Sequence, residues 1–129
     1  MDEEHLLVQR ERVSNHPDTA LMWIGLAHAL ERFPASAEEA KMASVKAVTL
    51  ARADDALVRY ALSTQAWVAK ALGDREVFEH AVSALVADAG VERQEDCGMF
   101  PTLVDDLPEG LCSPEIADAY RKALPKNGI

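Results

Sequence analysis

The sequence predicts an all-α protein built from stacked antiparallel helical hairpins, and two patterns support this class. Short polar, glycine- or proline-containing joints divide the 129 residues into segments of helical length, and no strand-like alternation persists between them. Alanine, the strongest helix former, occurs 19 times between residues 20 and 89. The length fits a single domain, and a hydrophobic content of 49% is sufficient for a buried core.

The first two helices are expected at residues 3–13 and from a cap at Asp18 or Thr19 to about Arg32. Either cap side chain can accept a hydrogen bond from the free N–H groups of the first turn. The second helix should stop near this arginine because Pro34 disfavours helical geometry in the residue before it.

The third helix is expected to begin after Ser36 and to end near Arg52. Ser36 and Glu39 have the spacing of a capping box, in which each side chain satisfies the backbone donor of the other residue. A fourth helix should follow a cap at Asp54 or Asp55.

The fourth helix should end near Leu72, because a glycine follows it directly. Asp74 is expected to cap a fifth helix that ends before Gly90. After an irregular stretch, the run 113–115 places a serine cap and a first-turn proline before a last helix to about Leu124.

The run from 17 to 30 resembles the start of a tetratricopeptide repeat. That family places Trp, Leu, a small residue and a bulky residue at fixed helical spacing in the first helix of each hairpin. Here these positions are taken by Trp23, Leu26, Ala27 and Leu30. The resemblance extends over about residues 17–90 and implies stacked hairpins, with a generic helical bundle as the alternative.

The second helix of the first repeat would use Ala40, Ser44 and Ala47. A second copy, whose register the sequence leaves open, would follow through Leu62, Ala66, Ala69, Phe78, Val82 and Leu85. One direct internal echo aligns residues 46–48 with residues 80–82, an offset of 34. Two copies are fewer than a stable stack normally needs, so the first and last helices are expected to act as caps.

The resemblance also implies a concave groove that binds peptides or partner helices. Carried over by position, the groove-facing candidates are Leu21, Ile24, His28, Glu31, Tyr60, Ser63, Thr64, Trp67 and Lys70. Tyr60 and Trp67 are the best interface anchors, because aromatic side chains concentrate binding energy. Trp67 is equally compatible with a core position, and Trp23 is expected in the core.

The sequence contains no convincing metal, cofactor or catalytic site. Cys97 and Cys112 are too few and too far apart for a disulfide scaffold or a zinc site. No pair of histidines has the one-turn spacing of two ligands on one helix. We therefore expect reduced structural cysteines, no metal, no cofactor and no enzymatic activity.

One enzyme motif is the alternative. Arg75 and His80 have the spacing seen in helical ribonuclease domains of the HEPN type, in which histidine acts as a general base. The intervening Glu76 and Glu79 would repel RNA, and the net charge of −9 is the wrong sign for a phosphate backbone. We therefore expect no nucleic-acid partner.

Residues 91–113 form an acidic, irregular segment ahead of the last helix at about 114–124. Between Glu92 and Asp118 there are eight acidic residues and one basic residue. The run 99–108 nevertheless contains several large apolar residues, so it should either pack back on the helices, which we favour, or act as a docking peptide. The acidity suggests a basic partner or a contribution to solubility.

No apolar run is long enough to cross a membrane, and the first residues lack the basic region of a secretory signal, which predicts a cytoplasmic protein. The function that follows is a protein-protein interaction module, acting as an adaptor, chaperone-like protein or regulatory subunit. The alternatives are the small helical enzyme that uses Arg75 and His80, and a structural subunit of a larger assembly.

Overall fold

The computed structural model describes residues 2–89 and 99–124, and these residues form helices and connections without any strand. The predicted all-α class is confirmed. The elements are α1 (Asp2–Asn15), α2 (Ala20–Leu30), the 3₁₀ helix η1 (Pro34–Ser36), α3 (Ala37–Asp54), α4 (Val58–Leu72), α5 (Arg75–Asp88), the 3₁₀ helix η2 (Pro101–Val104) and α6 (Pro114–Ala123).

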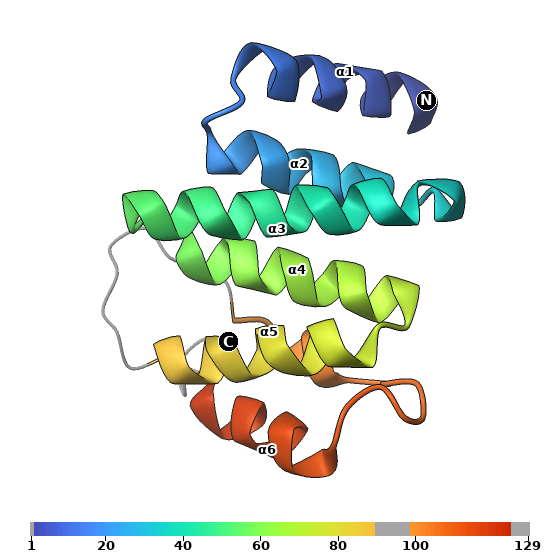
Figure 1. Ribbon diagram of the computed structural model, residues 1–129. Coiled ribbons are helices and arrows are strands. Elements are labelled where there is room, and N and C mark those ends of the chain that lie inside the picture. Colours follow the sequence, from blue (N-terminus) through green and yellow to red (C-terminus); the bar gives the residue numbers. More distant parts are fainter. Residues whose placement is uncertain (1, 90–98, 125–129) are drawn as a thin grey trace.

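The first five α-helices form an antiparallel stack in chain order, as Figure 1 shows. Each helix packs on the next one, and α2 also packs on α4. The pairs α2–α3 and α4–α5 are therefore two stacked hairpins, and α1 covers the free side of the first hairpin. This arrangement brings two helices that are separated by α3 in the sequence into direct contact.

Small side chains allow this close stacking. The buried face of α3 consists of Ala40, Ala43, Ser44, Ala47 and Ala51. Because none of these side chains is large, the axis of α3 can lie close to those of its neighbours. The larger core side chains come from the other helices, including Ile24 and Leu62.

Several residues of α3 and the residues 34 positions later in α5 are buried alike, which matches the internal offset of 34 found in the sequence. The positions buried in both helices are Ser44 and Phe78, Ala47 and Ala81, and Ala51 and Leu85. The two helices therefore turn equivalent faces toward the core, and their outer faces can be compared position by position.

Helix α1 packs on α2 at a position where only glycine fits without adjustment. A Cβ atom built on Gly25 would lie 2.6 Å from Oε1 of Gln9, a buried side chain on α1. Leu6 and Val13 are buried on the same face of α1. The glycine therefore leaves room for the amide end of Gln9 between α1 and α2, and a larger residue would require this flexible side chain to shift.

The segment that follows the second hairpin packs back on it, as favoured from the sequence. Leu103, Val104 and Leu111 are buried in the same core cluster as α4 and α5. From α6, Tyr120 is fully buried in that cluster. Residues 90–98 of the expected irregular segment, including Cys97, lie outside the described residues.

Tyr120 links α6 to the start of this segment. Its hydroxyl group accepts a hydrogen bond from the backbone N–H of Phe100 at 2.8 Å and donates one to the carbonyl oxygen of the same residue at 3.1 Å. Burial raises the pKa of Tyr120 to about 12. Arg121, the next residue, donates to the carbonyl oxygen of Val104 at 2.9 Å.

Helix α6 does not extend the antiparallel series, because it runs in the same general direction as α5 (Figure 1). Its cap residue, Ser113, donates its backbone N–H to Oε2 of Glu79 at 2.8 Å, and Glu79 lies in the first half of α5. Hydrogen bonds from Ser113 and Arg75 lower the pKa of Glu79. α6 therefore closes the stack beside α5.

The expected cap of the fourth helix at Asp54 or Asp55 is wrong. Asp54 is the last residue of α3, and Asp55 adopts a left-handed conformation with φ of 50° as its C-cap. The residue before α4 is Leu57, which is also left-handed with φ of 62°. Two left-handed residues so close together turn the chain sharply, and aspartate tolerates this conformation better than most residues do.

Three predicted caps occupy their positions without forming the expected bond. Thr19, Ser36 and Ser113 precede α2, α3 and α6, but none accepts a hydrogen bond from its own helix through its side chain. The capping box of Ser36 is therefore not formed. Its intended partner, Glu39, instead makes an ion pair with Arg10 of α1 at 2.7 Å.

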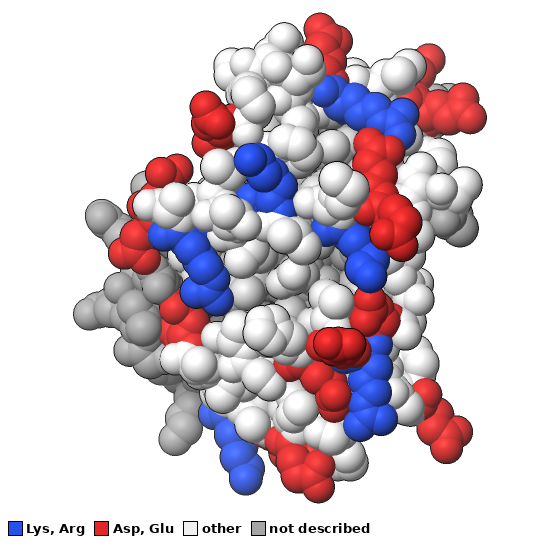
Figure 2. Space-filling view, viewed as in Figure 1, with Lys and Arg blue, Asp and Glu red and all other residues white. Residues whose placement is uncertain are grey.

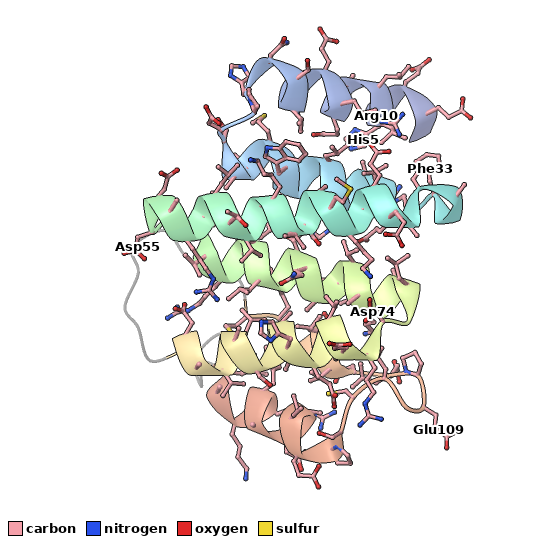
Figure 3. All side chains as sticks on the ribbon, viewed as in Figure 1. His5, Arg10, Phe33, Asp55, Asp74 and Glu109 are labelled. Carbon is pink, nitrogen blue, oxygen red and sulfur yellow. The ribbon has the colours of Figure 1, made fainter. Side chains whose placement is uncertain are left out.

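Asp74 caps α5 as predicted. Its carboxylate accepts from the backbone N–H of Val77 at 3.2 Å and makes an ion pair with Lys41 of α3 at 2.9 Å. These contacts lower the pKa of Asp74, the bond to Lys41 most strongly. Figure 3 shows Asp74 and Asp55 at opposite ends of α4, so Asp74 links the second hairpin to the first one at the end of α4 away from Asp55.

Asp74→Ala should lower the free energy of unfolding by about 0.5–2 kcal/mol at neutral pH, because it removes a formed helix cap. Ser113→Ala is the matched control, since this cap residue makes no side-chain cap bond, and it should have a smaller effect. Chemical denaturation of both variants tests the difference. Equal losses would contradict the assigned role of Asp74.

The effect of Asp74→Ala should also depend on pH. Because the folded-state pKa of Asp74 is lowered, its stabilisation is complete above the unfolded-state pKa and is lost as the pH falls through the folded-state pKa. Denaturation curves between about pH 7 and about pH 2 should show the wild type and the variant converging in stability. A constant difference would show that the charge of Asp74 is unimportant.

Candidate functional site

An open hollow lies where α2, α4 and η2 meet. Its volume is about 300 Å³, and its lining residues are His28, Tyr60, Ser63, Trp67, Phe100 and Thr102. Tyr60 and Trp67 are partly buried, and Phe100 is 39% exposed. We call this site the aromatic hollow, since three of its side chains are aromatic.

A second hollow of about 390 Å³ lies between α1 and α2 and reaches α4. Its lining residues are His5, Gln9, Arg12, Leu21, Met22, Ile24, Gly25, His28 and Tyr60. His28 and Tyr60 line both hollows. The two hollows are therefore adjoining parts of one surface across α1, α2, α4 and η2, which we call the inner strip.

A hydrogen-bonded network fixes His28 between the two hollows. The hydroxyl group of Thr64 donates to the carbonyl oxygen of Tyr60 at 2.9 Å, and Nε2 of His28 lies 2.9 Å from the same hydroxyl oxygen. Because the hydroxyl proton is used in the first bond, Nε2 of His28 is assigned as the donor in the second one. The network holds the imidazole ring in one orientation.

Two buried polar atoms beside this network have no hydrogen-bond partner among the described residues. One is Oγ of Ser63, which is in the lining of the aromatic hollow. The other is Oε2 of Glu31, which lies 3.5 Å from Nδ1 of His28 and makes an ion pair with it when the imidazole is protonated. An unsatisfied buried polar atom costs about 1–3 kcal/mol, so both atoms would gain from a suitable partner.

Lys70 fastens η2 to α4 at the edge of the aromatic hollow. Its ammonium group donates to the carbonyl oxygens of Thr102, Leu103 and Asp105 at 3.3, 3.2 and 3.0 Å. The same group lies 4.9 Å from the ring centroid of Trp67, close enough for a cation–π contact. The position of Trp67 is therefore set by both helix packing and Lys70.

The structure brings together part of the predicted groove. His28, Tyr60, Ser63 and Trp67 line the aromatic hollow, and Leu21 is 46% exposed beside α1. The other groove candidates serve mainly internal contacts: Ile24 and Thr64 are fully buried, Glu31 contacts His28, and Lys70 holds η2.

Sequence reasoning missed the parts of the inner strip that come from outside the two hairpins. Thr102 of η2 and Phe100, the residue just before η2, are two of these parts. The others are His5, Gln9 and Arg12 of α1. The apolar run around Phe100 was the available signal for the first pair. No local pattern in α1 shows which of its faces adjoins α2.

A third hollow of about 470 Å³ lies on the outer face of α3. Its lining residues are Trp23, Glu38, Lys41, Met42, Val45, Lys46 and Thr49. Trp23, expected in the core, is partly buried and packs against the buried core residues. Its indole N–H donates to the carbonyl oxygen of Pro17 at 2.8 Å. Figure 2 shows the α3 side of the molecule, where charges of both signs are interspersed.

The apolar character of this outer face is not required by the fold. Met42 is 71% exposed and Val45 is 52% exposed. At the equivalent positions of α5, 34 residues later, the chain carries Glu76 and Glu79. Glu76 is exposed, whereas Glu79 accepts a hydrogen bond from Ser113 at the start of α6. At the first of these positions, α5 therefore carries an exposed charge where α3 carries the apolar Met42.

The remaining candidates for chemistry are dispersed. Arg75 makes an ion pair with Glu79 at 3.2 Å, while His80 is exposed on the same helix. Cys112 is a free thiol whose pKa is raised by burial. Within residues 2–89 and 99–124, no cluster of His, Cys, Asp and Glu is suited to a metal ion, and no helix is long and apolar enough to span a membrane.

Comparisons with family models, curated proteins and solved structures found no match to this chain.

Lys70→Met should release the segment around η2 from α4, because the methionine cannot donate to the three carbonyl oxygens. Limited proteolysis should then cleave residues 99–107 faster than in the wild type. Lys46→Met is the matched control, since Lys46 is an exposed lysine on the outer face of α3. Equal cleavage of all three proteins would show that Lys70 does not hold the segment.

Proposed function

We propose that this protein is a protein-protein interaction module that binds a peptide segment of its partner along the inner strip. The observation that carries the proposal is the sharing of His28 and Tyr60 by two adjoining hollows. A ligand that follows this surface crosses α1, α2, α4 and η2. An extended or helical peptide has the shape to make such a contact.

The aromatic hollow supports this proposal by its composition. Tyr60, Trp67 and Phe100 are aromatic side chains that retain exposed surface on one concave site. Aromatic residues are enriched among the few side chains that dominate the energy of protein interfaces. A side chain of the partner that enters this hollow would bury apolar surface against all three.

The fixed geometry of the site also favours binding. Thr64 orients His28, and Lys70 ties the segment around η2 to α4. A site that is already ordered loses less conformational entropy when its ligand binds. This preorganisation is suited to recognition and requires no cofactor.

The position of the inner strip agrees with the tetratricopeptide resemblance. In that family the first helix of each hairpin lines the binding groove, and here α2 and α4 hold the corresponding positions. We propose an adaptor, chaperone-like or regulatory role without catalysis, in the cytoplasm.

Phe100→Ala and Trp67→Ala should each weaken peptide binding by about tenfold or more, because each removes an aromatic wall of the hollow. Peptides selected from a displayed random library against the wild-type protein would be measured by fluorescence anisotropy. Met42→Ala, at an exposed position on the outer face of α3, is the control and should leave the affinity unchanged.

Thermal melting of the same variants separates a binding effect from unfolding. Phe100 is 39% exposed, so its replacement should change the stability little. If the selected peptides bind Phe100→Ala and the wild type equally, the aromatic hollow is not the binding site. If Trp67→Ala mainly unfolds the protein, Trp67 is a core residue.

A second candidate function is that of a subunit in a larger assembly, joined through the outer face of α3. Met42 and Val45 are exposed beside a hollow on that face, whereas the equivalent positions of α5 are acidic. An exposed apolar patch of this kind is typical of an interaction surface. An obligate interface there would leave the inner strip free.

The double variant Met42→Glu, Val45→Glu tests this candidate by giving α3 the acidic residues of α5. If the outer face joins copies of the chain, light scattering after gel filtration should show a smaller assembly for the variant than for the wild type. Leu7→Glu, at an exposed apolar position on α1, is the control and should leave the mass unchanged. A wild type that is monomeric at all concentrations would exclude self-assembly through this face.

A further inference from the structure

The inner strip differs in charge from the rest of the protein. The chain contains 22 acidic and 13 basic residues, for a net charge of −9. Among the described residues that line its two hollows, there is no aspartate or glutamate. The ionisable side chains of basic type in this lining are His5, Arg12 and His28.

Arg12 is the fixed positive charge of the strip. Its side chain is exposed, and it makes no ion pair or hydrogen bond with the residues that the structure describes. Arg10, on the same helix, is instead engaged by Glu39 through two hydrogen bonds of 3.1 and 2.7 Å. The two arginines of α1 therefore differ: Arg10 is paired with Glu39 of α3, and Arg12 is available to a ligand.

Glu31 is an acidic residue beside the inner strip, but it is not in the lining of either hollow. Oε2 of Glu31 lies 3.5 Å from Nδ1 of His28, on the opposite side of the ring from the bond to Thr64. Its carboxylate therefore faces His28. A ligand that approaches Arg12 and His5 meets basic groups in the lining.

Local charge decides the preference of a surface for its ligand. Charges further away than a Debye length of about 8 Å are largely screened at physiological ionic strength. The overall negative charge opposes the binding of an acidic ligand only weakly, because most of it is screened. Direct contact of the ligand with Arg12 and His5 favours binding more strongly. The net acidity by itself suggested a basic partner, and the lining of the strip points the other way.

We propose that the inner strip binds an acidic peptide that places an apolar or aromatic side chain in the aromatic hollow and a carboxylate against Arg12 and His5. This inference rests on the proposed function, because it assigns the chemistry of the peptide at the same site. The apolar side chain supplies most of the affinity. The carboxylate sets the direction in which the peptide lies across α2.

The test is a selection of random 12-residue peptides displayed on phage, performed against the full chain. The selected peptides should be enriched in aspartate and glutamate relative to the starting library, and they should carry at least one large apolar residue. One selected peptide and its analogue with every acid replaced by the amide would then be synthesised. The amide analogue should bind more weakly.

Charge variants of α1 locate the effect. Arg12→Glu should lower the affinity for the acidic peptide by about fivefold or more, because an exposed charge pair is lost and replaced by repulsion. Arg10→Glu makes the same charge change on the same helix and is the matched control. Its effect on the affinity should be smaller, and both variants should be checked by thermal melting.

Increasing the salt concentration should lower the affinity of the wild type for the acidic peptide. The affinity of Arg12→Glu should change less, because screening removes an attraction that the variant lacks. If no peptide is selected, or if binding is unaffected by Phe100→Ala, the proposed function itself fails. If peptides bind through Phe100 but are neutral or basic and tolerate Arg12→Glu, the peptide site stands and the acidic ligand is overturned.

Discussion

The fold depends on the close approach of helices across the alanine-rich face of α3. Ala40, Ala43, Ala47 and Ala51 present no large side chain, so α2 and α4 can both pack on α3 and also touch each other. Contact between α2 and α4 is what places His28 beside Tyr60 and creates the inner strip. A large side chain at any of these alanines would separate the helices or strain the core.

An alanine-rich interface buries little apolar surface per residue, so stability must also come from the far end of the stack. There, Phe78, Leu103 and Tyr120 supply large buried side chains from α5, η2 and α6. The same packing brings Phe100 to the edge of the inner strip. The segment around η2 therefore has two roles: it completes the core, and it forms one wall of the aromatic hollow.

Charge is organised locally rather than uniformly. The lining of the inner strip contains no described acidic residue. Several acidic residues elsewhere support the fold: Asp74 caps α5, Glu79 holds the start of α6, and Glu39 binds Arg10 of α1. Arg12 stands apart from these pairs. The net charge of a small domain is consequently a poor guide to the ligand of one of its surfaces.

The sequence by itself determined where most helices begin and end, because Gly73, Asp74 and Pro114 act on their own backbone. The sequence did not predict the connection between α3 and α4, because left-handed residues such as Leu57 depend on how the two helices meet. The tetratricopeptide resemblance also pointed to Tyr60 and Trp67 of α4, which line the aromatic hollow, but not to Phe100. Only the tertiary structure decided that α1 and η2 complete it, since contacts between distant segments depend on packing that no local pattern contains.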